Sequence, residues 1–299
     1  MSGGASVPNV GIIGVGNMGG GMAANLLARG WPVHVCDLDP VKTADLERFG
    51  AVVHASGSKC AINSIALIIC VVDAAQTVEV LFGGADGSDG AAAALQPGQA
   101  VMLCPTIAPH DVEVIGSRLA ERGIHTIDAP MSGGPARARE GSMSLMVACA
   151  DAVFDKHQAL INALSSKVFR ISQRPGDGAR TKLVNNLAAG INLAAAAEVL
   201  ALAERMGLDL ACTLDVIEQS SGQSWIGSDR MRRAIANDYA PRAHTTLLAK
   251  DTRLAVEAAT AAGFDPVIGR QAAAVFAQAL DAGFAGEDDA SLIKLYRGR

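Results

Sequence analysis

The fold is decided near the start of the chain by the stretch Val10-Gly11-Ile12-Ile13-Gly14-Val15-Gly16-Asn17-Met18-Gly19. A short apolar run leads into three glycines spaced G-x-G-x-x-G, and an Ala/Leu-rich helical segment follows. In this setting Gly14 permits a sharp turn, Gly16 lets the backbone approach a pyrophosphate, and Gly19 lets the helix pack on the strand. The N–H groups of the helix N-terminus then face the phosphates. The stretch predicts a dinucleotide-binding turn.

The same glycines also occur in ordinary strand-to-helix turns, so the next predicted strand bears on this interpretation. The segment Val33–Cys36 ends in Asp37, 18 residues after Gly19, where a carboxylate accepts hydrogen bonds from the adenosine ribose hydroxyls. A 2′-phosphate beside that carboxylate would be repelled, and the nearest cation is Lys42. We therefore expect NAD rather than NADP, with a simple strand-end turn at Asp37 as the alternative.

Composition narrows the class of protein. The chain has 299 residues, 50% of them hydrophobic and 18% charged, which excludes a disordered chain. With 4% aromatics and a net charge of −5, it has neither the cation excess nor the stacking side chains of a nucleic-acid-binding protein. No apolar run of about 20 residues predicts a membrane span. The six cysteines form no C-x-x-C pair and are expected to be reduced. Met1–Asn9 shows no leader pattern, so we expect a cytoplasmic protein.

The first half alternates short apolar runs with helical stretches, which predicts an α/β fold with a parallel sheet covered by helices. These runs are rich in β-branched residues and are bordered by Gly, Pro or Asp. The expected strands are Val10–Ile13, Val33–Cys36, Ile65–Val72, Ala100–Cys104, Ile124–Asp128, Leu145–Ala148 and Lys167–Ile171. The fold class is an N-terminal Rossmann-type domain followed by an all-α domain.

After the turn-forming loop Ser172–Gly178 the sequence pattern changes from alternating strands and helices to helices alone. We expect a dinucleotide-binding domain over residues 1–174 and a helical substrate and oligomerisation domain over 175–299, joined by a long helix at about 181–206. That helix is apolar over much of its surface, and a small helical domain can cover only part of it. A homodimer or homotetramer is therefore expected.

The long helix also carries the candidate chemistry. Lys182 and Asn186 lie four residues apart, so they share one helix face. Oxidation of an alcohol needs a base for the hydroxyl proton, and an amine in a closing cleft near a helix N-terminus can have its pKa lowered for that role. Asn186 would orient the same oxygen without adding charge. A solvated first-turn lysine is the plainer alternative.

A second candidate cluster follows a predicted strand, at the edge where open α/β sheets bind ligands. In Asp128-Ala129-Pro130-Met131-Ser132-Gly133-Gly134, the Ser132 hydroxyl and the N–H groups of Gly133 and Gly134 can bind a carboxylate, although the loop can also be a simple connector. Thr106 follows another strand, and Lys250 begins a helical segment with Asp251. The six histidines have no paired ligand spacing, so no metal is expected.

Four motifs in this order resemble the β-hydroxyacid dehydrogenase family, which includes 3-hydroxyisobutyrate dehydrogenases, tartronate semialdehyde reductases and L-threonate dehydrogenases. They are Gly14–Gly19, Asp128–Gly134, Gly178–Asn186 and Lys250–Ala255, and the resemblance spans nearly the whole chain. Within the family, the chain looks most like the L-threonate dehydrogenase branch. One departure is Arg137, where many relatives carry glycine.

The resemblance implies roles for individual residues. Lys182 would be the catalytic acid/base together with Asn186, and Asn186 would also bind substrate. Further substrate contacts would come from Ser132, Gly133 and Gly134. The residues that the resemblance implies for cofactor binding lie at strand ends and helix starts: Gly14, Gly16, Asn17, Met18, Gly19, Asp37, Val72, Asp73, Gln76, Thr106 and Lys250.

The expected reaction is NAD-dependent oxidation of the 2-hydroxyl of a small L-threonate-like sugar acid to the 2-oxo acid. A semialdehyde reductase or a 3-hydroxyisobutyrate dehydrogenase of the same family is the alternative enzyme. A non-catalytic cofactor-binding scaffold is a remote alternative, and the presence of Lys182 disfavours it.

Overall fold

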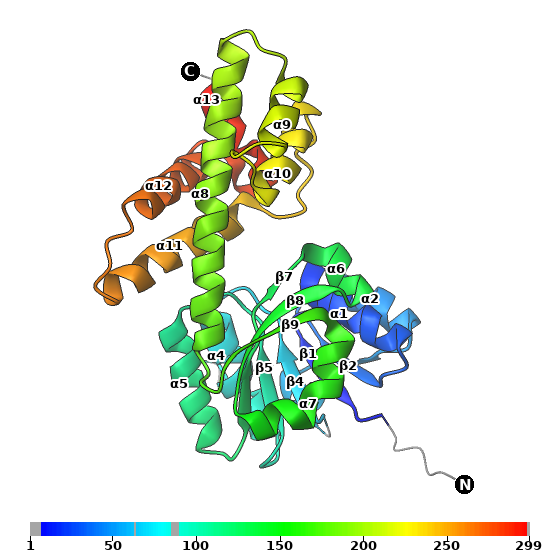
Figure 1. Ribbon diagram of the computed structural model, residues 1–299. Helices are drawn as coiled ribbons and strands as arrows, with labels where there is room; N and C mark the ends of the chain where they lie inside the picture. Colours follow the sequence, from blue (N-terminus) through cyan, green and yellow to red (C-terminus); the bar gives the residue numbers. More distant parts are fainter. Residues whose placement is uncertain (1–6, 63, 85–89, 298–299) are drawn as a thin grey trace. The chain divides into compact units, whose positions relative to one another are not determined.

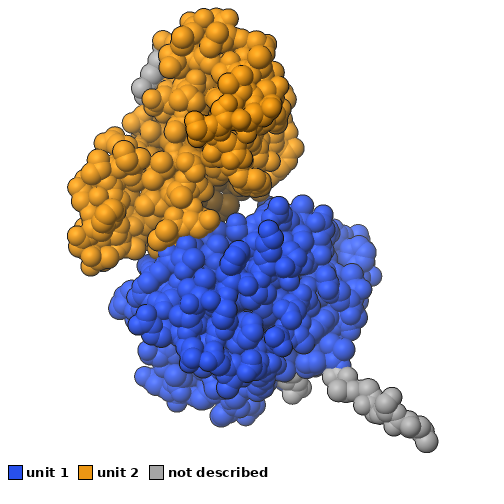
Figure 2. Space-filling model, viewed as in Figure 1, with its two compact units in different colours: residues 1–182 blue, residues 183–299 orange. Residues whose placement is uncertain are grey.

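The computed structural model describes residues 7–62, 64–84 and 90–297. Most of the expected N-terminal lead, residues 1–6, lies outside the described residues. The chain forms two compact units, residues 1–182 and residues 183–299 (Figure 2). The long helix α8 (Asp177–Arg205) contributes its first turns to the first unit and the rest to the second.

One sheet of nine strands, counted over the described residues, forms the centre of the first unit (Figure 1). Its six parallel strands are short and mostly apolar, as expected for strands covered on both faces. In spatial order they are β3 (Val52–Val53), β2 (Val33–Cys36), β1 (Val10–Ile13), β4 (Ala66–Ile69), β5 (Ala100–Leu103) and β6 (His125–Asp128). The strand order reverses at β1 and β4, where the Rossmann arrangement binds its ligand.

The rest of the sheet departs from the all-parallel arrangement that the sequence predicts. β8 (Met143–Ala148) runs antiparallel to β6 and to the two-residue strand β7 (Met131–Ser132), and β9 (Ser165–Ser172) pairs with β8 in parallel. β3 and β7 are not among the expected strands. The sheet is therefore mixed, with its antiparallel part beyond β6.

Helices cover both faces of this sheet and close two apolar cores. One face carries α1 (Asn17–Ala28), α2 (Pro40–Arg48), α6 (Gly134–Glu140) and α7 (Asp151–Leu164). The other face carries α3 (Gly57–Ala61), α4 (Ala74–Phe82), η1 (Ala91–Ala93) and α5 (Pro109–Ala120). This is the α/β layering that the alternating sequence predicts.

Among its described residues, the second unit contains helices and a single isolated bridge between His244 and Asp288. Its core is centred on the fully buried Phe276. The helices after α8 are α9 (Leu210–Glu218), α10 (Trp225–Ile235), α11 (Thr245–Ala261), α12 (Val267–Asp281), η2 (Phe284–Gly286), η3 (Asp289–Ile293) and α13 (Lys294–Arg297). Buried carboxylates hold the last segment: Asp289 pairs with Arg230, and Asp288 with Arg233.

Helix α8 is long and apolar enough to cross a bilayer by length and composition alone. However, 44% of its most apolar window is buried inside the protein, and polar side chains interrupt it at Lys182 and Asn186. The helix therefore packs partly in the protein core and leaves part of its apolar surface exposed. All six cysteines are free thiols.

Candidate active site

The three glycines in the turn between β1 and α1 are needed for different physical reasons. Gly14 has φ +87°, and a Cβ there would approach the Cys70 carbonyl oxygen to 2.7 Å. At Gly19 a Cβ would overlap the carbonyl oxygen of Gly14, so only glycine lets α1 approach the strand. A Cβ on Gly16 would meet no atom of this chain within 4 Å. The first two glycines are required by packing, whereas the space beside Gly16 is available to a ligand.

The N-terminus of α1 is suited to an anion. Its N-cap residue is Gly16, and no side chain caps it. Asn17 is exposed at the start of the helix, and Met18 packs partly against the core. The first-turn N–H groups of a helix carry partial positive charge, so a phosphate group fits here.

Asp37 lies directly after β2 and is bound to the glycine turn. Its Oδ2 accepts a hydrogen bond of 2.8 Å from the Val15 N–H, and its Oδ1 accepts one of 2.9 Å from Asp39. Lys42 Nζ is 3.8 Å from Asp37 Oδ1. The glycine turn therefore positions the Asp37 carboxylate, and Lys42 is the cation beside it.

The residues after β4 form a helix cap. Asp73 Oδ1 accepts from the Gln76 N–H at 2.9 Å, and Gln76 Oε1 accepts from the Val72 N–H at 3.1 Å. The first bond caps the N-terminus of α4 and the second ties Gln76 to the residue before the cap, so Asp73 and Gln76 have a local structural role at the start of α4. Val72 is 56% exposed at the carboxyl end of the sheet. Thr106, after β5, is half-buried at the same edge.

The Ser-Gly-Gly loop links β7 to α6. Ser132 is the last residue of β7 and pairs with Ser144 of β8, which fixes where the loop begins. Gly133 and Gly134 have φ of +133° and +74°, a conformation that favours glycine. The aliphatic part of the Arg137 side chain packs against Gly133, where a Cβ would lie 2.8 Å from Arg137 Cδ. A cationic side chain therefore packs on the loop that is predicted to bind a carboxylate.

Lys182 lies in the second turn of α8 and is only 8% exposed. The helix begins at Asp177, earlier than the sequence predicts, and its first turn is bound to the sheet. The buried carboxylate of Asp128, at the end of β6, accepts hydrogen bonds from the Gly176 and Ala179 N–H groups at 2.7 and 3.1 Å. The first unit thus brings Lys182 and the loop after β6 into one connected structure.

In the second unit, Asn186 and Lys250 are joined by a residue that the sequence analysis does not assign. Asp251 is buried; its Oδ2 accepts from Asn186 Nδ2 at 2.6 Å, and its Oδ1 is 2.9 Å from Lys250 Nζ. Asn186 Oδ1 accepts from Asn185 Nδ2 at 3.0 Å. Asp251 shares the buried face of α11 with Leu248 and Ala255. A carboxylate within that apolar repeat is the sequence signal that could have found it.

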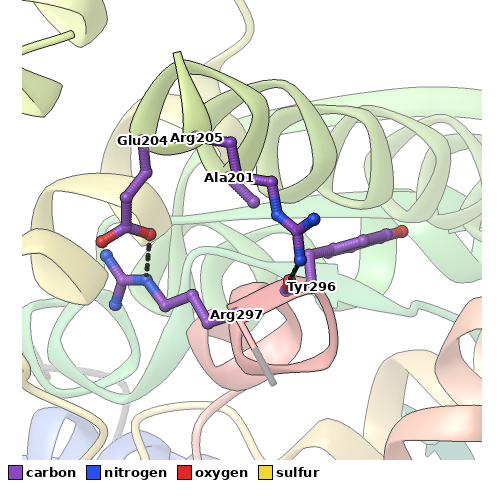
Figure 3. A pocket seen from close by; sticks show the side chains of 5 residues that line it. All are labelled: Ala201, Glu204, Arg205, Tyr296 and Arg297. Atoms are coloured by element: carbon purple, nitrogen blue, oxygen red, sulfur yellow. Dashed lines mark hydrogen bonds and ion pairs between the residues drawn. The ribbon is translucent and has the colours of Figure 1, made fainter. Parts of the chain in front are cut away.

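The predicted site residues do not line the pocket shown in Figure 3, a hollow of about 250 Å³ in the second unit. Its lining side chains are tied together: Arg297 pairs with Glu204 at 2.7 Å, and Arg205 donates to the Tyr296 carbonyl at 3.4 Å. These contacts join the end of α8 to α13. No group of three or more potential metal ligands occurs within the described part of the chain.

The glycine turn fits a dinucleotide on its own geometry, since Gly16 leaves open space beside an uncapped helix end. Two family models cover almost the whole chain and agree with this geometry. Residues 9–172 match the NAD binding domain of 6-phosphogluconate dehydrogenase, and residues 176–296 match the domain described as NAD-binding of NADP-dependent 3-hydroxyisobutyrate dehydrogenase.

Known proteins resemble the chain over its full length. An L-threonate dehydrogenase of Cupriavidus necator is 38% identical over 97% of this chain and 96% of its own length. A 3-hydroxyisobutyrate dehydrogenase of Pseudomonas aeruginosa is 35% identical over 97% of this chain and 99% of its own. A crystal structure of a 3-hydroxyisobutyrate dehydrogenase from Salmonella typhimurium superposes with a TM-score of 0.88 at 38% identity, over 96% of this chain and 99% of that one. The chain is therefore an NAD(P)-dependent oxidoreductase that belongs to the β-hydroxyacid dehydrogenase family.

Proposed function

We propose that this enzyme oxidises the 2-hydroxyl of a small L-threonate-like sugar acid to the 2-oxo acid, with Lys182 as the general acid/base. The observation that carries the proposal is the burial of Lys182 one helical turn before Asn186 on α8. The 38% identity to an L-threonate dehydrogenase supports the substrate class.

The chain's own residues divide the work of this reaction. A nicotinamide cofactor held by the glycine turn would supply the hydride acceptor for the oxidising direction. The neutral amine of Lys182 takes the hydroxyl proton as the carbonyl forms, and in reverse its ammonium returns that proton. The Asn186 amide donates a hydrogen bond to the same oxygen, and Asp251 holds that amide in place.

The substrate carboxylate is assigned to the loop after β7. Ser132 offers a hydroxyl, and Gly133 and Gly134 offer N–H groups from a backbone that only glycine adopts easily. Arg137, whose aliphatic part packs against Gly133, adds a positive charge to this loop and can bind a carboxylate or a sugar hydroxyl. Its additional hydrogen-bond donors favour a polyhydroxylated acid over hydroxyisobutyrate, which has fewer hydroxyl groups to bind.

We assign cofactor binding to the glycine turn, to Val72, Asp73 and Gln76 after β4, and to Thr106 and Lys250. NAD is proposed over NADP because Asp37 is held at the turn by the Val15 N–H, where it would repel a 2′-phosphate. We further propose a cytoplasmic location, where the NAD pool is available, and the domain division after residue 174 that the sequence predicts.

We propose a homo-oligomer because α8 exposes an apolar stripe. The stripe recurs at every third or fourth position of the helix and reaches the residue that follows it: Val184, Ala188, Ile191, Ala195, Val199, Leu202 and Met206. Leu202 is 55% exposed and Met206 66%. A continuous apolar stripe of this length is typical of a surface that a second subunit covers.

Initial rates of cofactor reduction test the reaction. L-threonate, D-threonate, 3-hydroxyisobutyrate, glycerate and 4-hydroxybutyrate are compared in parallel, each with NAD and with NADP. We expect the highest kcat/KM with L-threonate and NAD. A clear preference for 3-hydroxyisobutyrate would favour the alternative that the Pseudomonas aeruginosa relative supports, and no turnover of any acid would favour a non-catalytic scaffold.

A further inference from the structure

Asp128 is a buried carboxylate for which the proposed reaction has no direct use. It is the last residue of β6, is 1% exposed, and lies four residues before Ser132. Its Oδ2 accepts two hydrogen bonds from another part of the first unit, the N–H groups of Gly176 and Ala179. These amides belong to the start of α8, three to six residues before Lys182.

We propose that Asp128 is a positioning residue, whose carboxylate holds the first turn of α8 at the end of β6 and so sets the place of the Lys182 amine relative to the Ser132 loop. The inference rests on the proposed role of Lys182 as acid/base. It assigns to Asp128 no contact with substrate or cofactor. The physical basis of this role is that a charged acceptor aligns the N-terminal amides of a helix more strongly than a neutral acceptor does.

The packing around Asp128 leaves little freedom for the helix start. A Cβ on Gly178 would lie 2.9 Å from the Asp128 carboxyl and 2.8 Å from the Met146 carbonyl oxygen. Only glycine therefore lets the helix approach the sheet this closely. Gly176, with φ +101°, turns the chain into the helix immediately before. A shift of this turn would displace Lys182, which lies in the next turn of the same hydrogen-bonded helix.

The charge of Asp128 is maintained against the cost of burial. Burial raises the pKa of its carboxyl to about 6; the N–H groups of Ala179, Gly176 and Gly178 oppose this rise, and the charge of Asp177 adds to it. The thiols of Cys104 and Cys149, after β5 and β8, have their own pKa values raised in part by the same carboxylate. At neutral pH the group is ionised, with backbone amides as its principal stabilising partners.

This pKa has a definite consequence for stability. The folded-state pKa lies above the ordinary value of 3.8, so the folded form binds the proton more tightly than the unfolded chain does. The contribution of Asp128 to stability therefore falls as the pH rises from about 4 to about 6, and stays low above that. A charge retained at a cost to stability points to a role in activity.

The test compares Asp128→Asn with wild type. The variant keeps the shape of the side chain and one acceptor oxygen but removes the charge. We expect kcat to fall at least tenfold, KM for NAD to stay within twofold, and the midpoint of thermal unfolding at pH 7 to stay equal or rise. Amide hydrogen exchange at Gly176 and Ala179 should become faster, and stability should fall less than in wild type between pH 4 and pH 6.

Asp177→Asn is the matched control, because Asp177 lies at the same helix end as the amides that Asp128 holds. Its own carboxylate accepts hydrogen bonds from the side chains of Ser172 and Arg180. Its kcat should stay within twofold of wild type. The proposal is overturned if Asp128→Asn keeps kcat within twofold, or if kcat and the unfolding midpoint fall together, as a purely structural brace would require. If the wild type oxidises no acid of the panel, the proposed function fails. In that case, unchanged exchange at Gly176 and Ala179 overturns the positioning role of Asp128 separately.

Discussion

Asn186 donates a hydrogen bond of 2.6 Å to Asp251, a residue 65 positions further along the chain. The same carboxylate pairs with Lys250 at 2.9 Å. One buried acid therefore orients the amide that is proposed to hold the substrate and the amine that is proposed to contact the cofactor. Asn186 Nδ2 carries two hydrogens, so an amide held by Asp251 through one of them can donate the other to a substrate oxygen.

Replacement of Asp251 should expose this dependence. In Asp251→Ala the Asn186 amide loses its partner and can rotate, so we expect kcat to fall about 100-fold, as for the loss of one oriented donor. In Asn186→Ala, kcat should fall by a similar factor. Because both changes remove the Asn186–Asp251 hydrogen bond, the double variant should be little worse than Asp251→Ala, which also removes the contact with Lys250. Steady-state kinetics of the three variants give these kcat values. Fully additive losses would show that Asn186 and Asp251 act independently.

The glycine turn allows a sharp comparison between two substitutions. Gly16→Ala adds a methyl group where the chain itself has open space, so the unfolding midpoint should stay unchanged while affinity for NADH falls at least tenfold. Gly19→Ala forces a methyl group onto the Gly14 carbonyl and should cost about 1–3 kcal/mol of stability. Fluorescence titration with NADH and thermal unfolding distinguish the two. Undiminished NADH affinity in Gly16→Ala would place the dinucleotide elsewhere.

Cofactor choice should depend on the charge of Asp37. In Asp37→Ser the repulsion of a 2′-phosphate disappears and Lys42, 3.8 Å away in the wild type, can pair with that phosphate. We expect the ratio of kcat/KM for NADP to that for NAD to rise by about 10- to 100-fold, the value of one or two strong charge-assisted contacts. Adding Lys42→Ala should reverse part of the gain. An unchanged ratio in Asp37→Ser would remove Asp37 from cofactor selection.

The exposed stripe of α8 should hold subunits together. Val199→Lys with Leu202→Lys places two charges in the proposed interface, and light scattering should then report a mass near the 30.6 kDa of one chain. The wild type should show at least twice that mass. Val114→Lys, at an exposed apolar residue of α5, is the matched control and should leave the mass unchanged. A monomeric wild type at micromolar concentration would contradict the proposal.

The sequence predicted the elements whose pattern is local. Val10–Ile13 with its glycines and Val33–Cys36 with Asp37 carry both the strand and the turn within a few residues, and the structure has both strands with those bounds. The two-residue strand β7 was missed because two residues in a Pro/Gly-rich loop carry no alternation. Its pairing depends on β8, which lies a dozen residues away.

The start of helix α8 and the two buried acids Asp128 and Asp251 depend on contacts between residues far apart in the chain, which the sequence pattern does not predict. Gly176 and Gly178 are typical breakers, so the helix was expected at about 181, yet its first turn forms earlier because Asp128 accepts its amides from 48 and 51 residues away. The sequence pattern assigns no role to Asp251 for the same reason, since its partner Asn186 is distant in the chain. Tertiary hydrogen bonds of this kind leave no periodic signal in the sequence.

The most direct measurement is the rate of NADH formation by Lys182→Met, which keeps an unbranched side chain of similar length to the lysine stem but removes the amine. Loss of a general base should lower kcat by about 10²- to 10⁴-fold, while NADH affinity stays within threefold of wild type. Lys182→Arg should not restore the rate, because a guanidinium does not give up its proton at these pH values. A Lys182→Met enzyme that turns over within threefold of wild type would contradict the central role of this amine.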